Sequence, residues 1–147
     1  MTPAQSSSEN ADGGMRAIHG PYRVVIIEER ALALVLGRLL ERLGQQVETA
    51  YDGRGGIKLV IATRPDIVFT RIELPDMDGF QFARDIRSRC GKRPVLVAHT
   101  GHGKSRMGSE AKEAGFDLFV VKPSGLKELR GVLSFMAGKR DCAEILL

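Results

Sequence analysis

Five short strand-forming runs alternate with five segments of helical periodicity, and this alternation constrains the fold more than any other feature of the sequence. The first run, RVVII, is almost continuously apolar, which is typical of a strand covered on both faces. The predicted strands are Arg23 to Ile27, Gln46 to Ala50, Ile67 to Thr70, Val95 to Ala98 and Leu118 to Val121. Strands that alternate with helices predict a parallel sheet with helices on both sides.

The clearest predicted helix lies between the first two strands, where apolar residues recur at steps of three and four and Gly44 ends the helix. Its stripe is Leu32, Val35, Leu36, Leu39, Leu40 and Leu43. The next helix contains Ile57, Val60 and Ile61, is weakened by Gly53, Gly55 and Gly56, and ends before Pro65. The other helices are expected at Phe80 to Arg89 (inner side Ala83 and Ile86), Lys104 to Ala114, and Gly125 to Ala137 (inner side Leu126, Leu129, Leu133 and Met136).

Right-handed crossovers then give an α/β fold, a doubly wound five-stranded parallel sheet in the flavodoxin-like order 2-1-3-4-5. A length of 147 residues suits one domain, which we place at residues 22–139. Residues 1–21, rich in small and polar types, are expected to form a flexible tail, and residues 140–147 a short C-terminal tail. Folds of this kind bind ligands in a crevice at the carboxyl ends of the strands.

Composition excludes several classes of protein. No apolar run approaches the roughly 20 residues that cross a bilayer, and the first twenty residues lack the apolar middle of a signal peptide. We therefore expect a cytoplasmic protein with no membrane partner. Cys90 and Cys142 lie far apart and are expected to be free thiols. The net charge of +4 is spread over helix faces without the aromatic or zinc-finger spacing of a nucleic-acid binder, so no nucleic-acid partner is expected.

Polar residues follow the strands that end at the predicted crevice. They are Glu28 and Glu29 after the first strand, Arg71 after the third, Thr100 after the fourth and Lys122 after the fifth. Because the carboxyl ends of parallel strands meet at one edge of a sheet, we expect these side chains to converge. Arg71 is the unusual member, since it ends a buried apolar strand beside two acids.

Together with the segment PDIVFTRIELPDMDG, this set resembles the response-regulator receiver domain over roughly Tyr22 to Lys139. In that family two acids and an acceptor aspartate after the third strand hold Mg²⁺, a Thr and a Lys bind phosphoryl oxygens, and an aromatic residue acts as a switch. The resemblance implies an acidic pocket of Glu28 and Glu29, phosphate-binding equivalents at Thr100 and Lys122, and the switch aromatic at Phe119.

Arg71 occupies the position of the acceptor aspartate in this resemblance. A guanidinium stays protonated, so it cannot attack a phosphoryl group or bind a metal ion. We therefore expect no catalytic residue, no metal, no cofactor and no enzymatic activity. The function implied is that of a pseudo-receiver in two-component (phosphorelay) signalling, which acts as a phosphorylation-independent protein-interaction module.

Charge balance predicts how Arg71 is held. Glu28 and Glu29 supply two negative charges against two positive charges from Arg71 and Lys122. A guanidinium forms forked hydrogen bonds with a carboxylate, so we expect Arg71 to pair with Glu28 or Glu29, and its removal to cost roughly 1–4 kcal/mol. A solvent-facing Arg71 is the alternative.

Other acids and histidines are also expected near the crevice. Of the acids in the loop after Arg71 (Glu73, Asp76 and Asp78), the two aspartates are expected to shape the turn with Gly79, and none to replace the acceptor. His99 and His102 are expected at the rim of the crevice, without the spacing of a metal site.

Two alternative functions stay open at this point. The segment Ala98 to Ser105 (AHTGHGKS) fits a relaxed phosphate-loop pattern, which would indicate a nucleotide-binding NTPase. Against it, no later strand ends in the aspartate that would hold Mg²⁺. The second alternative is a relic regulator that docks a histidine kinase without accepting phosphate.

The resemblance also implies a partner, a histidine kinase or another signalling protein. Receivers typically signal through the fourth helix, fifth strand and fifth helix, where Phe119 would be fixed in one orientation. The cations expected on this surface are Lys104, Arg106, Lys112, Lys127 and Arg130. They favour an acidic partner, and homodimerisation stays open.

Overall fold

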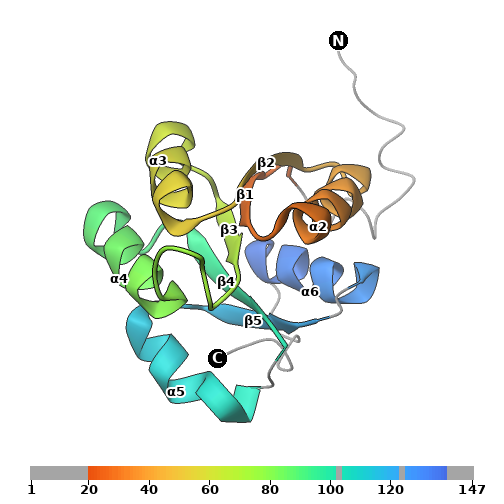
Figure 1. The fold of residues 1–147 in the computed structure, drawn as a ribbon. Helices are drawn as coiled ribbons and strands as arrows, with labels where there is room; N and C mark the ends of the chain where they lie inside the picture. Colours follow the sequence, from red (N-terminus) through yellow and green to blue (C-terminus); the bar gives the residue numbers. More distant parts are fainter. Residues whose placement is uncertain (1–19, 102–103, 123–124, 139–147) are drawn as a thin grey trace.

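A five-stranded parallel sheet forms the centre of the computed structural model, which describes residues 20–101, 104–122 and 125–138 (Figure 1). Its strands are β1 (Arg23–Ile27), β2 (Gln46–Ala50), β3 (Ile67–Thr70), β4 (Val95–Thr100) and β5 (Leu118–Val121). All neighbouring strands are parallel, and their order is β2-β1-β3-β4-β5. The predicted fold class and strand order are confirmed, and β4 is two residues longer than expected.

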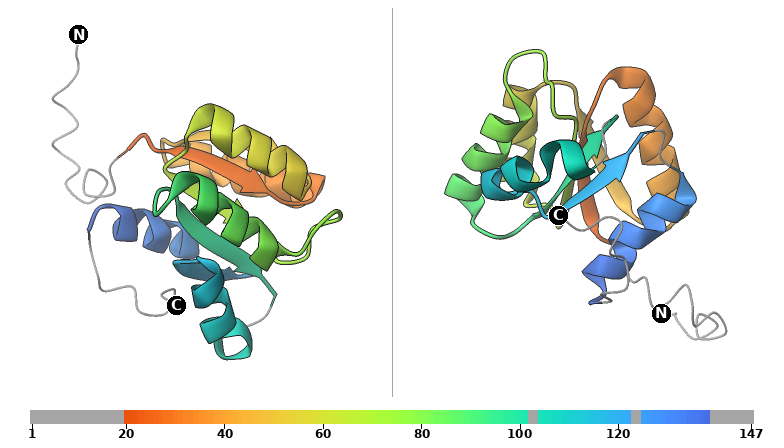
Figure 2. Two further views of the ribbon diagram at one scale, coloured as in Figure 1. Left: turned by 90° about the vertical axis from the view of Figure 1, so that its left-hand side faces the viewer. Right: turned by 90° about the horizontal axis from the view of Figure 1, so that it is seen from below.

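The helices of the described residues cover both faces of this sheet. They are α2 (Arg30–Arg42), α3 (Gly53–Thr63), α4 (Gly79–Cys90), α5 (Lys104–Ala114) and α6 (Leu126–Met136). Helices α2 and α6 lie on one face, and α3, α4 and α5 lie on the other (Figures 1 and 2). None of the helices in these residues is long and apolar enough to span a bilayer.

Two hydrophobic cores sandwich the sheet, because successive strand residues point to opposite faces. In β1, Val24 and Ile26 pack with α2 and α6, whereas Val25 and Ile27 pack with α3 and α4. All four side chains are buried, which explains why β1 is apolar at every position from Val24 onwards.

Three glycines lie inside α3. Gly56 is buried against β1, and a Cβ at this position would lie 2.6 Å from the Ile27 side chain. The close approach of α3 to the sheet therefore requires glycine here, in spite of its cost to the helix.

Two predicted core positions are wrong. Val35 was assigned to the apolar stripe of α2, but its side chain is 56% exposed, because α2 faces the sheet through Ala33, Leu36 and Leu40. Leu126 was assigned to the inner side of α6, but it is the first residue of that helix and is exposed. The predicted tails fall almost wholly on residues outside the described ranges, as does Cys142.

Arg87 of α4 ties together the end of the sheet opposite the crevice. Its Nε donates to the carbonyl of Gly115 at 2.9 Å, and its Nη1 donates to the carbonyls of Gly91 and Pro94. Its Nη2 forms a 2.6 Å ion pair with the carboxylate of Asp117. One guanidinium thus joins the end of α4, the start of β4 and the turn before β5.

We expect Arg87→Ala to lower the free energy of unfolding by about 2–3 kcal/mol, because charged hydrogen bonds are lost and three carbonyls lose a donor. Arg87→Lys should recover little of this stability, because an ammonium group cannot span the same acceptors. Urea unfolding measures both variants. Arg84→Ala is the control, since Arg84 is exposed on the same helix; equal losses at both positions would contradict the assigned role of Arg87.

Candidate functional site

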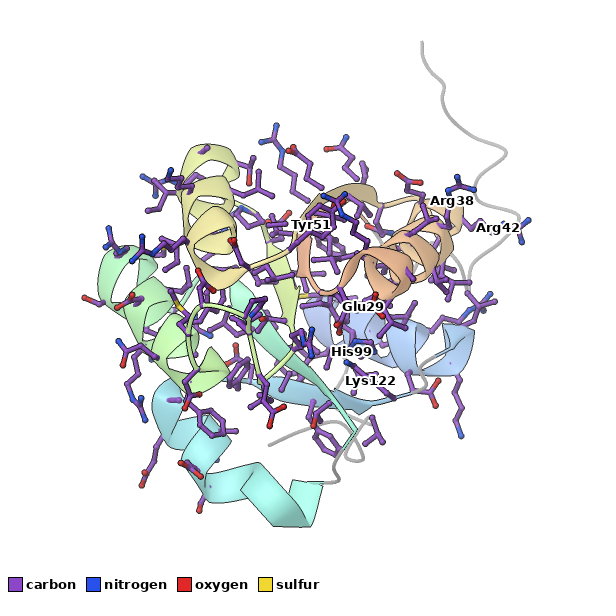
Figure 3. The ribbon with its side chains drawn as sticks, in the orientation of Figure 1. Glu29, Arg38, Arg42, Tyr51, His99 and Lys122 are labelled. Atoms are coloured by element: carbon purple, nitrogen blue, oxygen red, sulfur yellow. The ribbon has the colours of Figure 1, made fainter. Side chains whose placement is uncertain are left out.

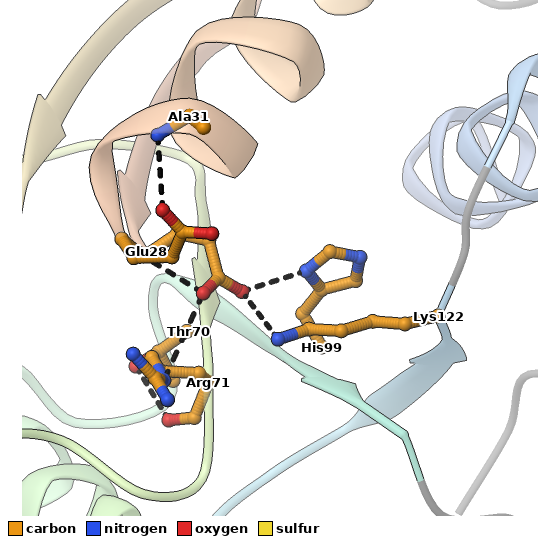
Figure 4. Close-up of polar contacts among 7 residues, drawn as sticks. Glu28, Ala31, Thr70, Arg71, His99 and Lys122 are labelled. Atoms are coloured by element: carbon orange, nitrogen blue, oxygen red, sulfur yellow. Dashed lines mark hydrogen bonds and ion pairs between the residues drawn. The ribbon is translucent and has the colours of Figure 1, made fainter.

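Figure 3 shows His99 and Lys122 near each other at the centre of the protein. The carboxyl ends of β1, β3, β4 and β5 bring these two residues together with Glu28 and Arg71 (Figure 4). Continuing the parallel register of β1, β3 and β4 places Glu28, Arg71 and His99 side by side. Lys122 follows β5, and its main-chain N–H donates to the carbonyl of Thr100 at 2.7 Å. The predicted convergence of these strand ends is therefore present.

Glu28 is the centre of the cluster and is only 1% exposed. Its Oε2 lies 3.0 Å from Nζ of Lys122 and 3.0 Å from Nδ1 of His99. Its Oε1 accepts a hydrogen bond from the N–H of Glu29 at 3.0 Å. Because an ionised carboxylate only accepts hydrogen bonds, Nδ1 of His99 must carry the proton in this contact.

The surroundings of Glu28 keep it ionised. Burial alone raises the pKa of its carboxyl, because the charged form loses water. The hydrogen bonds from His99, Lys122 and the Glu29 N–H, together with the charge of Lys122, outweigh burial and hold that pKa below its ordinary value of 4.5. The cluster therefore contains a buried, ionised carboxylate at neutral pH.

Glu29 does not join the cluster as an acid. It is exposed and is the N-cap of α2, where its Oε1 accepts a hydrogen bond from the N–H of Ala31 at 3.1 Å. The expected balance of two negative and two positive charges is therefore wrong within the cluster. Glu28 alone faces the cations of Lys122 and Arg71, while Glu29 satisfies a helix terminus that favours negative charge.

Arg71 is held loosely. Its Nε lies 3.7 Å from Oε1 of Glu28, and 32% of its side chain is exposed. The pairing with Glu28 is confirmed, but the forked hydrogen bonds expected between the two groups are not formed. Arg71 contributes a nearby charge more than a directed bond, and Lys122 is the closer partner of Glu28.

The loop after Arg71 is anchored by both of its aspartates. The carboxylate of Asp76 accepts hydrogen bonds from the N–H groups of Gly53 and Arg54 at the start of α3. Asp78 caps α4 by accepting from the N–H of Phe80. The turn role of Asp78 is thus confirmed. Asp76 bonds its own main-chain N–H in the turn and in addition reaches across to a neighbouring helix.

Three further side chains predicted near the crevice are buried. Thr100 ends β4 and is buried, and Phe119 of β5 is also buried, in the core beneath α4 and α5. His99 was expected at the rim of the crevice, but its side chain is buried beside Glu28. The alternation of side chains along β4 could have predicted the burial of His99, because His99 lies on the same face of the sheet as the buried Val97. His102 lies outside the described residues.

This donor set does not fit a divalent metal ion. The oxygens of Glu28 already face two cationic or N–H donors each, counting Arg71. Within the described ranges, no group of three His, Cys, Asp or Glu side chains is arranged to hold a metal. Two cations beside one carboxylate also oppose a further positive charge.

The fold and site define a flavodoxin-like α/β domain with a polar cluster at the carboxyl ends of its strands. The model of the response regulator receiver domain family matches residues 24–134, and the chain belongs to this family.

Curated relatives and solved structures agree with this family. Response regulator MprA of Mycolicibacterium vanbaalenii is 34% identical over 110 residues, which cover 74% of this chain and 47% of that protein. A protein-glutamate methylesterase/protein-glutamine glutaminase of Koribacter versatilis is also 34% identical, over 70% of this chain and 29% of that protein. The chain thus spans less than half of either relative.

Among solved structures, a response regulator receiver domain from Methylobacillus flagellatus superimposes with a TM-score of 0.70 at 27% identity. The match covers 78% of this chain and 96% of that domain. The match to the family model includes the segment from Ala98 to Ser105, so the resemblance of this segment to a phosphate loop carries less weight than the receiver assignment.

We expect Glu28→Gln to lower the free energy of unfolding at pH 7 by about 3 kcal/mol, because Lys122 loses a buried partner. The folded-state pKa of Glu28 is lowered, so its contribution is fully present above the unfolded pKa and is lost as pH falls through the folded value. The difference between wild type and variant should therefore shrink below pH 4.5. Urea unfolding across pH checks this, with exposed Glu41→Gln as control; a constant difference for Glu28→Gln would contradict it.

Removal of Arg71 should cost less than the sequence suggested. Its contact with Glu28 is long and partly exposed, so Arg71→Ala should lower the free energy of unfolding by about 1 kcal/mol or less. Lys122→Ala should cost more, because Lys122 lies closer to the same carboxylate. Parallel urea melts compare the two variants, and equal costs would show that Arg71 pairs more tightly than its 3.7 Å contact indicates.

Proposed function

We propose that this receiver domain acts in two-component signalling as a protein-interaction module that does not accept phosphate. The observation that carries the proposal is Arg71 at the carboxyl end of β3, the position of the acceptor aspartate in the family. Its guanidinium is not a nucleophile and does not lose its proton in proteins. The module therefore has no phosphorylation step and no enzymatic activity.

Three acids near Arg71 support this proposal. Glu28 is buried and ion-paired, which leaves its carboxylate poorly placed for attack on an incoming phosphoryl group. Asp76 and Asp78 accept hydrogen bonds from main-chain N–H groups at the starts of α3 and α4. Each of these carboxylates already has a structural task, so none replaces the missing acceptor.

The same contacts explain how the crevice is ordered without metal or phosphate. Lys122 and His99 satisfy the carboxylate of Glu28, and Asp76 holds the loop after Arg71 against α3. The working state is thus built into the chain, and its partner is a signalling protein such as a histidine kinase. Docking to that partner would not depend on transfer of a phosphoryl group.

Incubation with acetyl phosphate and Mg²⁺ tests the proposal. We expect the wild-type chain to gain no phosphoryl group in intact-mass spectra, because the nucleophile is absent. Arg71→Asp restores a carboxylate at the end of β3 and should yield a hydroxylamine-sensitive adduct. Arg84→Asp, on the exposed side of α4, is the matched control and should yield none. A hydroxylamine-sensitive adduct on the wild type would refute the proposal.

A further inference from the structure

A histidine is buried in the otherwise apolar middle of β4. The side chain of His99 is only 3% exposed, and Val97, on the same face of the sheet, packs in the core with α2 and α6. A buried polar group is costly unless it is hydrogen-bonded. Nδ1 of His99 meets this requirement at Oε2 of Glu28, 3.0 Å away, across the intervening strand β3.

The two oxygens of the Glu28 carboxylate have different partners (Figure 4). Oε2 lies 3.0 Å from both Nδ1 of His99 and Nζ of Lys122. Oε1 accepts from the N–H of Glu29 at 3.0 Å and lies 3.7 Å from Nε of Arg71. Each carboxylate oxygen offers about two lone-pair positions, so the two donors at Oε2 occupy it fully. Arg71 therefore faces one oxygen only, and the other is held by donors that do not depend on it.

A magnesium ion would require a different orientation of this carboxylate. Mg²⁺ dehydrates reluctantly and keeps several waters in octahedral geometry, whereas Glu28 is only 1% exposed. To bind the hydrated ion, the carboxylate must turn toward solvent and leave its donors. Lys122 has a flexible stem and is 25% exposed, so it can follow or release the carboxylate. The ring of His99 is fixed within a central strand, so it resists this rotation.

We infer that His99 is a positioning residue that keeps the Glu28 carboxylate turned into the protein and bars divalent metal ions from the crevice independently of Arg71. The absence of metal binding then has two separate causes in this chain. One is a guanidinium after β3, and the other is an imidazole N–H that holds the acid after β1. Replacing Arg71 with aspartate does not remove the second cause.

This inference deepens the proposed function, because it explains how the crevice keeps one arrangement whatever the metal concentration. It rests on that function only for the role of Arg71. A hydrogen bond to a carboxylate can also orient it for a metal ion, in which case its removal weakens metal binding. The burial of Glu28 indicates the opposite sign here, because the hydrogen bond from His99 holds the carboxylate away from solvent.

Titration of Mg²⁺ into the ¹⁵N-labelled full chain, followed by NMR, tests the inference. The wild type should show no saturable binding, and Arg71→Asp alone should bind weakly. Arg71→Asp combined with His99→Leu should bind at least about tenfold more tightly than Arg71→Asp, the range in which partners of metal ligands act. The melting temperature of this double variant should also rise most with Mg²⁺, because an ion that binds the folded state stabilises it.

His99→Asn is the matched control, because its amide N–H can take the place of Nδ1. Combined with Arg71→Asp, it should bind Mg²⁺ no more tightly than Arg71→Asp alone. His99→Gln places its amide nearer the position of Nε2 and should act like His99→Leu, which keeps the comparison possible if the leucine variant does not fold.

Three results would overturn the inference: saturable Mg²⁺ binding by the wild type, equal affinities of Arg71→Asp with and without both His99→Leu and His99→Gln, or weaker binding after these His99 substitutions. A phosphoryl adduct on the wild type in the acetyl phosphate experiment would refute the proposed function alone, since the Mg²⁺ titrations compare substitutions of His99 and measure no phosphoryl transfer.

Discussion

A buried carboxylate at the end of β1 is the constraint on which the site depends. An ionised group without water is costly unless it is paired and hydrogen-bonded, and Glu28 is almost wholly buried. Its partners come from the carboxyl ends of three other strands: Arg71 after β3, His99 in β4 and Lys122 after β5. Satisfying one charge thus draws four strand ends together and defines the centre of the crevice.

The same constraint explains why a cation is compatible with this position of β3. In the receiver family the strand ends gather carboxylates and a metal ion. In this chain Glu28 is the only carboxylate of the described residues within the cluster, and Lys122 and Arg71 already supply positive charge. An ordered crevice is therefore consistent with a receiver that works without metal or phosphate, as proposed above.

Much of the fold could be predicted because its signals are local. Strand β5 and helix α5 have the predicted bounds, since short β-branched runs and turn residues mark their ends. The predicted burial of Val35 and Leu126 is wrong, because periodicity identifies the apolar side of a helix but not how much of that side packs against the sheet. Likewise, the residue types of Glu28 and Glu29 do not distinguish a buried pair from a helix cap.

Residue types and their near neighbours are enough to predict the order of strands and helices, the two-sided burial of β1 and the presence of Arg71 at the end of β3. Three features follow from tertiary packing instead: the choice of the acid that enters the cluster, the presence of His99 in it, and the exposure of Leu34 and Val35. Each of these outcomes depends on the direction of a side chain relative to elements distant in sequence, which strand register and helix rotation set together.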